Sequence, residues 1–247
     1  MKQTSFAALS AIALALAAGS ADAQIANGNF NGLDSWSTAG DAASVSTGGS
    51  HLVLTNAFSD GFDDLSTDGK NHNVSGNDPW PTGGGAGSLE EFVGVLGGAF
   101  DPDPANFVQA YEGSAALQTF TIAKGGNLSF QWNFSTTETS GDPTLADIGF
   151  VVIDGKVITL ANTLATSAIS GGDYAAETGW ESWSTMLGAG SHTIAFGVVD
   201  VGSTTDSSAL SVTGLGASAV PESSTLAMFG AGLGLLAALQ RRRHGKV

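Results

Sequence analysis

A strict alternation of apolar and polar residues over residues 128–134 is the feature that most constrains the fold of this chain. The sequence LSFQWNF places leucine, two phenylalanines and tryptophan at every second position, with polar residues between them. Successive side chains of a strand point to opposite faces of its sheet, so the pattern indicates a strand with one buried and one polar face. Such half-buried strands are typical of antiparallel sheets.

Other segments also predict strands. Residues 148–153 and 156–160 are joined by Asp154-Gly155, a dipeptide that tolerates the positive φ angles of a two-residue hairpin turn. Glycine-rich breaks separate the strands, since 35 of the 247 residues are glycine. The remaining expected strands cover residues 51–55, 116–122 and 192–199.

One short helix is expected after Ser88. Ser88 and Glu91 have the spacing of a capping box, in which each side chain accepts a hydrogen bond from the other residue's amide. Gly97 is expected to end the helix, whose buried face would carry Leu89, Phe92, Val93 and Leu96. Many strands and one helix predict a mainly β fold, an antiparallel, jelly-roll-like β-sandwich.

The first 23 residues have the layout of a secretory signal peptide. Lys2 supplies the positive end, residues 6–18 form an apolar helix, and Ala21-Asp22-Ala23 is an A-x-A cleavage site. The apolar stretch is shorter than the ~20 residues that a membrane-spanning helix needs. We therefore expect signal peptidase to remove residues 1–23 from an exported chain.

Residues 220–247 combine a short motif, an apolar helix and a basic end. Pro221 and Glu222 precede an apolar run at residues 225–239, and Arg241, Arg242 and Arg243 follow it. A basic cluster beside an apolar segment stays on the cytoplasmic side, so these arginines would set the orientation and leave the preceding domain outside.

This tail resembles the PEP-CTERM sorting signal of Gram-negative bacteria, a Pro-Glu-Pro motif with a transmembrane helix and an arginine-rich end. Pro221 and Glu222 carry the match, whereas Ser223 stands where the second proline is expected. The resemblance implies export, transient anchoring in the inner membrane, cleavage by an exosortase, and a final place at the cell surface or outside the cell. A plain C-terminal membrane anchor is the alternative.

Between the two tails, residues 24–219 are expected to form one acidic domain. They hold three lysines, no arginine and 21 acidic residues, and the chain has no cysteine. Because nothing in this domain could neutralise phosphates, nucleic acid is excluded as a partner. The missing cysteines exclude disulfides and thiolate metal sites.

The opening of this domain is similar to the start of jelly-roll carbohydrate-binding and galactose-binding-like modules. Residues 27–36 read NGNFNGLDSW, where those modules often read N-G-x-F-E-x-G-L-x-x-W. The resemblance implies a sugar-binding sandwich that Phe30 plugs at one end. It also implies a structural calcium held by acids at the positions of Asn31 and Thr213, but neither residue is acidic. We therefore expect no cofactor.

An acidic loop is the alternative place for calcium. Residues 60–87 are expected to form a long mobile surface loop that contains several aspartates. Calcium prefers oxygen ligands, but these aspartates do not have the spacing of an EF-hand loop.

Exposed tryptophans are the candidates for ligand binding, because sugar rings stack on aromatic faces. Trp80 lies between two prolines in the expected loop, while Trp180 and Trp183 flank a turn and the start of a strand. Trp36 and Trp132 are expected in the core or at its edge.

No catalytic motif is present: the sequence lacks HExxH, G-x-S-x-G and the P-loop. It therefore predicts a non-enzymatic protein of the cell surface or extracellular matrix, associated with exopolysaccharide. A carbohydrate-binding module is the first alternative. The second is a glycoside hydrolase with a carboxylate pair chosen from Glu90, Glu91, Glu112, Glu138, Glu177 and Glu181.

Overall fold

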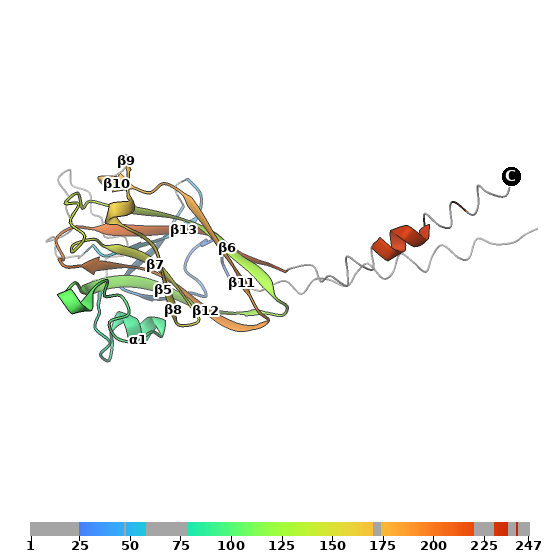
Figure 1. The fold of residues 1–247 in the computed structure, drawn as a ribbon, viewed down its shortest axis with the longest axis horizontal. Coiled ribbons are helices and arrows are strands. Elements are labelled where there is room, and N and C mark those ends of the chain that lie inside the picture. Colours follow the sequence, from blue (N-terminus) through green and yellow to red (C-terminus); the bar gives the residue numbers. More distant parts are fainter. Residues whose placement is uncertain are drawn as a thin grey trace, which may run out of the picture.

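A computed structural model describes residues 25–46, 48–57, 79–169, 174–219, 230–236 and 241. Two antiparallel sheets pack face to face and contain most of the regular structure (Figure 1). The predicted mainly β fold, an antiparallel β-sandwich, is therefore confirmed. The proposed signal peptide and the motif residues Pro221 and Glu222 lie outside the described residues, as do Arg242 and Arg243.

The first sheet has six strands. Its order is β1 (Ser37–Ala39), β5 (Ala110–Ile122), β12 (Gly190–Val201), β7 (Ile148–Ile153) and β8 (Lys156–Asn162), and β4 (Trp80–Pro81) also pairs with β5. The second sheet has seven strands. Its order is β2 (Asp41–Val45), β3 (His51–Thr55), β13 (Ser208–Ala219), β6 (Gly126–Thr136), β10 (Ala176–Glu177) and β9 (Ala168–Ile169), and β11 (Glu181–Leu187) also pairs with β6.

The core between the sheets uses the apolar faces that alternation predicts. In β6 every second side chain from Leu128 to Phe134 is buried, which confirms Trp132 as a core residue. Phe30 is fully buried, and its ring centroid lies 5.1 Å from that of Trp36. Both rings also approach Phe196 of β12. The segment before β1 is thus part of the core.

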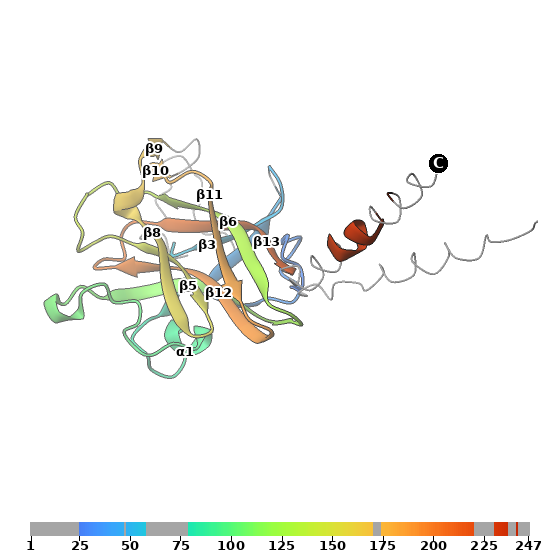
Figure 2. The same cartoon turned by 45° about the vertical axis from the view of Figure 1, so that its right-hand side comes forward.

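The two sheets differ in what covers their outer faces. On the first sheet a second apolar cluster joins Ala115 of β5, Val152 of β7 and Ala195 of β12 to Leu89 and Val93 of α1 (Leu89–Val93). Figure 2 shows α1 beside this sheet. The outer face of the second sheet carries mainly polar residues, among them Ser129, Gln131 and Asn133 of β6.

The helix is shorter than predicted. Ser88 Oγ accepts a hydrogen bond from the amide of Glu91, as a capping box requires, but Glu91 accepts from the amide of Gly87 and not from that of Ser88. Gly94, at φ 76°, ends the helix, so the expectation of an end at Gly97 is wrong. Leu96 consequently lies outside the helix and is 85% exposed.

The prediction of a loop over residues 60–87 is also wrong in part. Residues 58–78 lie outside the described residues, and with them the proposed calcium loop. Trp80 and Pro81 instead form β4, in which Trp80 pairs with Gly113 of β5. The Trp80 ring packs edge-on against Phe92, with 5.5 Å between centroids. Trp80 is therefore half-buried in the cluster that covers the first sheet.

Residues 230–236 are helical, and their leucines are exposed. Within the described part of the chain, no helix has the length and apolar character needed to cross a membrane. The predicted apolar run at residues 225–239 lies only partly within that region.

The predicted hairpin turn is present between β7 and β8. Asp154 has φ 50° and Gly155 has φ 77°, as a two-residue type I′ turn requires. The Asp154 carboxylate also accepts a hydrogen bond from the amide of Thr193, which ties the turn to β12.

This turn predicts a backbone effect at Gly155. We expect Gly155→Ala to lower the free energy of unfolding by roughly 1–2 kcal/mol, because a Cβ atom disfavours the left-handed conformation. Urea denaturation followed by circular dichroism measures the loss. Gly188→Ala is the matched control, since Gly188 has no positive φ and no atom near an added Cβ. An equal loss in both variants would contradict the assignment of the cost to the turn.

Candidate functional site

The outer face of β3, β13, β6 and β11 carries a row of uncharged polar side chains. We call this surface the polar face and define it by His51, Ser129, Gln131, Ser182, Ser184 and Thr213. The strand register brings these residues together, since Gln131 pairs with Thr213 on one side and with Ser182 on the other. Ser129 pairs with Ser184 in the same way.

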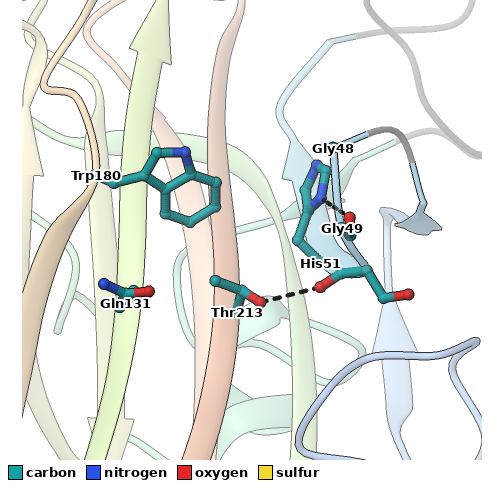
Figure 3. A pocket seen from close by; sticks show the side chains of 7 residues that line it. Gly48, Gly49, His51, Gln131, Trp180 and Thr213 are labelled. Atoms are coloured by element: carbon teal, nitrogen blue, oxygen red, sulfur yellow. Dashed lines mark hydrogen bonds between the residues drawn. The ribbon is translucent and has the colours of Figure 1, made fainter.

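A first hollow of about 230 Å³ lies where the polar face meets the turn between β2 and β3. Figure 3 shows Gln131 and Thr213 on neighbouring strands, with Trp180 on one side and His51 on the other. The rings of His51 and Trp180 are 6.0 Å apart and nearly perpendicular. Gly179, at φ 75°, redirects the chain just before Trp180.

Two hydrogen bonds hold the far wall of the first hollow in place (Figure 3). His51 Nδ1 lies 2.9 Å from the carbonyl oxygen of Gly49, and the Thr213 hydroxyl donates to the carbonyl of Ser50 at 2.9 Å. A carbonyl only accepts, so Nδ1 of His51 carries a proton. In the neutral ring Nε2 is then an acceptor.

A second hollow of about 400 Å³ lies over β6 and β11 and also touches Gln131. A β-bulge in β13 borders it, because Thr213 pairs with Gln131 but the next paired residue, Gly216, faces Ser129. The bulge residue Gly214 has φ 64°, and the space around its Cα is open. Because Gly214 has no side chain, no atom projects from the bulge over the second hollow.

The chemistry of both hollows is neutral. The described residues that line them carry amide, hydroxyl, imidazole and indole groups, one phenyl group and several glycines, and none is an acid, a lysine or an arginine. The amide of Gln131 makes no hydrogen bond to another described residue. Amides and hydroxyls both donate and accept, which suits a ligand rich in hydroxyl groups.

The three predicted tryptophans have different environments. Trp180 is 50% exposed and borders the first hollow. Trp183 borders the second hollow, but its ring stacks on Phe130 with 5.1 Å between centroids. Trp80 lies in β4, away from both linings. The structure therefore brings Trp180 and Trp183 to one sheet and leaves Trp80 on the other.

Sequence reasoning did not select the other residues of the polar face. Gln131 and Ser129 were visible as the polar half of the alternating strand, but a solvated face explains that pattern equally well. Thr213 was noticed only as a missing acid, and His51 only as the start of a strand. Their proximity depends on long-range strand pairing, for which no local sequence signal exists.

The acidic candidates do not line either hollow. Glu90 accepts a hydrogen bond from the amide of Gly83, and Glu177 accepts one from Asn133. Glu138 is buried and accepts from Ser140. Among the residues that the structure describes, no group of three or more acidic or histidine side chains is arranged to hold a metal ion.

A separate, buried polar network joins the ends of several strands. The carboxylate of Asp147, just before β7, accepts hydrogen bonds from Asn56 Nδ2 (3.0 Å), Ser208 Oγ (2.7 Å) and the amide of Val201 (3.1 Å). Asn56 Nδ2 also donates to Asp200. Burial raises the pKa of Asp147 to about 7, although the hydrogen bonds act in the opposite direction. Donors from three segments bond to this carboxyl group, which thereby joins the ends of β3, β12 and β13 to β7.

Two solved structures are distant likenesses of this chain. No known family matches the sequence, and no curated protein matches it. A family 35 carbohydrate-binding module from an environmental isolate has 17% identity and a TM-score of 0.22, covering 44% of this chain and 73% of that one. The enzymatically active domain of bacteriophage CBA120 tailspike protein 4 has 12% identity and a TM-score of 0.26, covering 81% of this chain and 22% of that one. Neither TM-score is high enough to carry an argument about this chain.

Proposed function

We propose that this chain is an exported, non-enzymatic protein that binds an extracellular polysaccharide through the polar face. The observation that carries the proposal is the half-exposed indole of Trp180 beside a hollow lined by amides and hydroxyls without a charged group. An aromatic face supplies apolar contact to a sugar ring, and the surrounding polar groups bind its hydroxyls.

The strand order supports a jelly roll as the scaffold of this site. Four strands of the second sheet follow the order β3-β13-β6-β11, and four of the first follow β5-β12-β7-β8. Consecutive strands such as β5 and β6, or β12 and β13, lie in different sheets, as the Greek-key connections of a jelly roll require.

The proposal of export rests on the two terminal segments. The signal-like residues 1–23 would direct the chain across the inner membrane, and residues 220–247 would hold it there until an exosortase cleaves near Pro221 and Glu222. Mass spectrometry of the secreted form tests this pathway. We expect the chain to begin at Gln24 and to lack Arg241, Arg242 and Arg243, whereas an intracellular protein with both ends intact would contradict export.

An array of immobilised polysaccharides tests ligand binding. We use the full chain in a non-glycosidic detergent and expect at least one polysaccharide to retain it. Trp180→Ala should weaken this binding at least about tenfold, because burying a large apolar side chain contributes roughly 1.5–3 kcal/mol.

Tyr111→Ala is the matched control for the array. Tyr111 is an aromatic residue of the first sheet with nearly the same exposure, 47%, and we expect its replacement to leave binding unchanged. Absence of binding to every polysaccharide would overturn the proposal, as would equal losses in the two variants.

A further inference from the structure

We infer that the two hollows form one continuous track, which contacts several sugar rings of an extended, uncharged polysaccharide at once. This inference rests on the proposed function and specifies its ligand. Gln131 lines both hollows, so its amide lies at their junction and is reached from either side.

The length of the track follows from the strand register. His51, Thr213, Gln131 and Ser182 lie on four neighbouring strands, and their side chains form a row across the sheet. Neighbouring strands are ~4.8 Å apart, so this row extends about 14 Å. A single sugar ring is shorter than this distance and could not contact His51 and Ser182, at the two ends of the row, at the same time.

The chemistry of the track selects a neutral polymer. Recognition of a uronic acid, sulfate or phosphate group calls for a cationic partner. Neither lining contains lysine or arginine. The formal charge of the whole chain is −15, which further disfavours a polyanion.

One side of the track is closed by internal hydrogen bonds. Asn133, the next outward residue of β6 after Gln131, donates from Nδ2 to Glu177 at 2.7 Å. Its carbonyl oxygen lies 3.2 Å from the hydroxyl of Thr178, whose single proton it shares with the carbonyl oxygen of Gly179 at 2.9 Å. Both ends of this amide are therefore occupied within the protein. The unoccupied amide of Gln131 and the open surface at Gly214 mark the part of the sheet that is left for a ligand.

A length series of oligosaccharides tests the track. The neutral polysaccharide that binds best in the array is partially hydrolysed, and fragments of one to eight rings are titrated against the full chain by calorimetry. We expect affinity to rise by at least about tenfold between one ring and four, and then to level off when the row is filled. Equal affinity for one ring and for longer fragments would overturn the inference.

A double variant locates the far end of the track. Ser182→Ala/Ser184→Ala removes two hydroxyls from β11, and a hydrogen bond contributes about 1 kcal/mol, or roughly fivefold in affinity. We expect this variant to bind long fragments about five- to twentyfold more weakly and single rings unchanged. Thr159→Ala, an exposed hydroxyl of β8 in the other sheet, is the control and should change nothing.

The outcomes separate this inference from the proposed function. Loss of binding in Trp180→Ala together with unchanged binding in the double serine variant would leave a sugar site and remove the extended track. Preferential binding of a uronic acid-containing polymer in the array would likewise remove the neutral ligand and keep the sugar site. No binding to any polysaccharide would overturn both.

Discussion

Replacement of Phe196 by alanine should lower the free energy of unfolding by about 3–5 kcal/mol, the usual cost of truncating a fully buried phenylalanine. Phe196 has no exposed surface, and its ring lies 4.8 Å from that of Phe130, measured between centroids. The rings of Phe30 and Trp36 are 6.4 Å and 6.1 Å away. Truncation would therefore remove contacts to the opposite sheet and to the segment before β1 at the same time.

Urea denaturation followed by tryptophan fluorescence measures this loss. Phe107→Ala is the matched control, because Phe107 is 84% exposed and its truncation should change stability by less than about 0.5 kcal/mol. Phe196→Leu keeps most of the volume and should fold with a smaller loss if the alanine variant does not fold. A loss below 1 kcal/mol in Phe196→Ala would contradict the described packing between the sheets.

The parts of the fold that the sequence predicts are those encoded locally. Alternation identified β6 and β12, because burial of every second side chain against the other sheet leaves a two-residue period in the sequence. The Asp154-Gly155 signal identified the β7–β8 hairpin. The Asp154-Gly155 turn was predicted for a similar reason, since few dipeptides tolerate two positive φ angles. In contrast, β2 reads DAASV, which has small residues and no strong alternation, and it was not predicted.

Two errors, one in the helix end and one in the place of Trp80, have different causes. Gly97 was expected to end the helix, but Gly94 does so, and Gly97 lies so close to Gly84 that an added Cβ would be 3.0 Å from its Cα. Trp80 was placed in a loop because prolines flank it, although the end of a short edge strand accommodates proline. The helix end is set locally, because the amide of Gly94 bonds back to the carbonyls of Glu90 and Glu91. For Trp80 the pairing with β5 decided the outcome.

The candidate site was predictable only in its aromatic part. Trp180 was selected as a tryptophan beside a turn and the start of a strand, and it is half-exposed beside the first hollow. Its neighbours Gln131, Thr213 and His51 come from three strands that are far apart in the chain. The bulge at Gly214 also depends on strand pairing, since one extra residue shifts the register by an amount that composition does not reveal.

The buried network at Asp147 predicts an unusual dependence of stability on pH. Burial raises the pKa of this carboxyl from its usual value of 3.8 to about 7. The folded state therefore binds a proton that the unfolded state releases between these two pH values. Stability from this group is fully present below pH 3.8 and falls as the pH rises to 7, by about 4 kcal/mol in total at 1.36 kcal/mol per pH unit.

Asp147→Asn tests this prediction because asparagine keeps the size of the side chain and does not titrate. We expect the difference in unfolding free energy, wild type minus variant, to decrease between pH 4 and pH 7 and to be constant outside this range. Asp142→Asn is the control: hydrogen bonds from Thr144 lower the pKa of the exposed Asp142, so its proton is lost below this range. Its difference from wild type should be constant over the same interval.

The carbon chemical shift of the Asp147 carboxyl group gives a second readout that does not require the variant to fold. In the wild-type protein this shift should change with a midpoint near pH 7. A midpoint below pH 4, or a constant difference between wild type and Asp147→Asn, would mean that Asp147 is ionised throughout. The donors Asn56, Ser208 and Val201 would then stabilise the carboxylate enough to offset the cost of its burial.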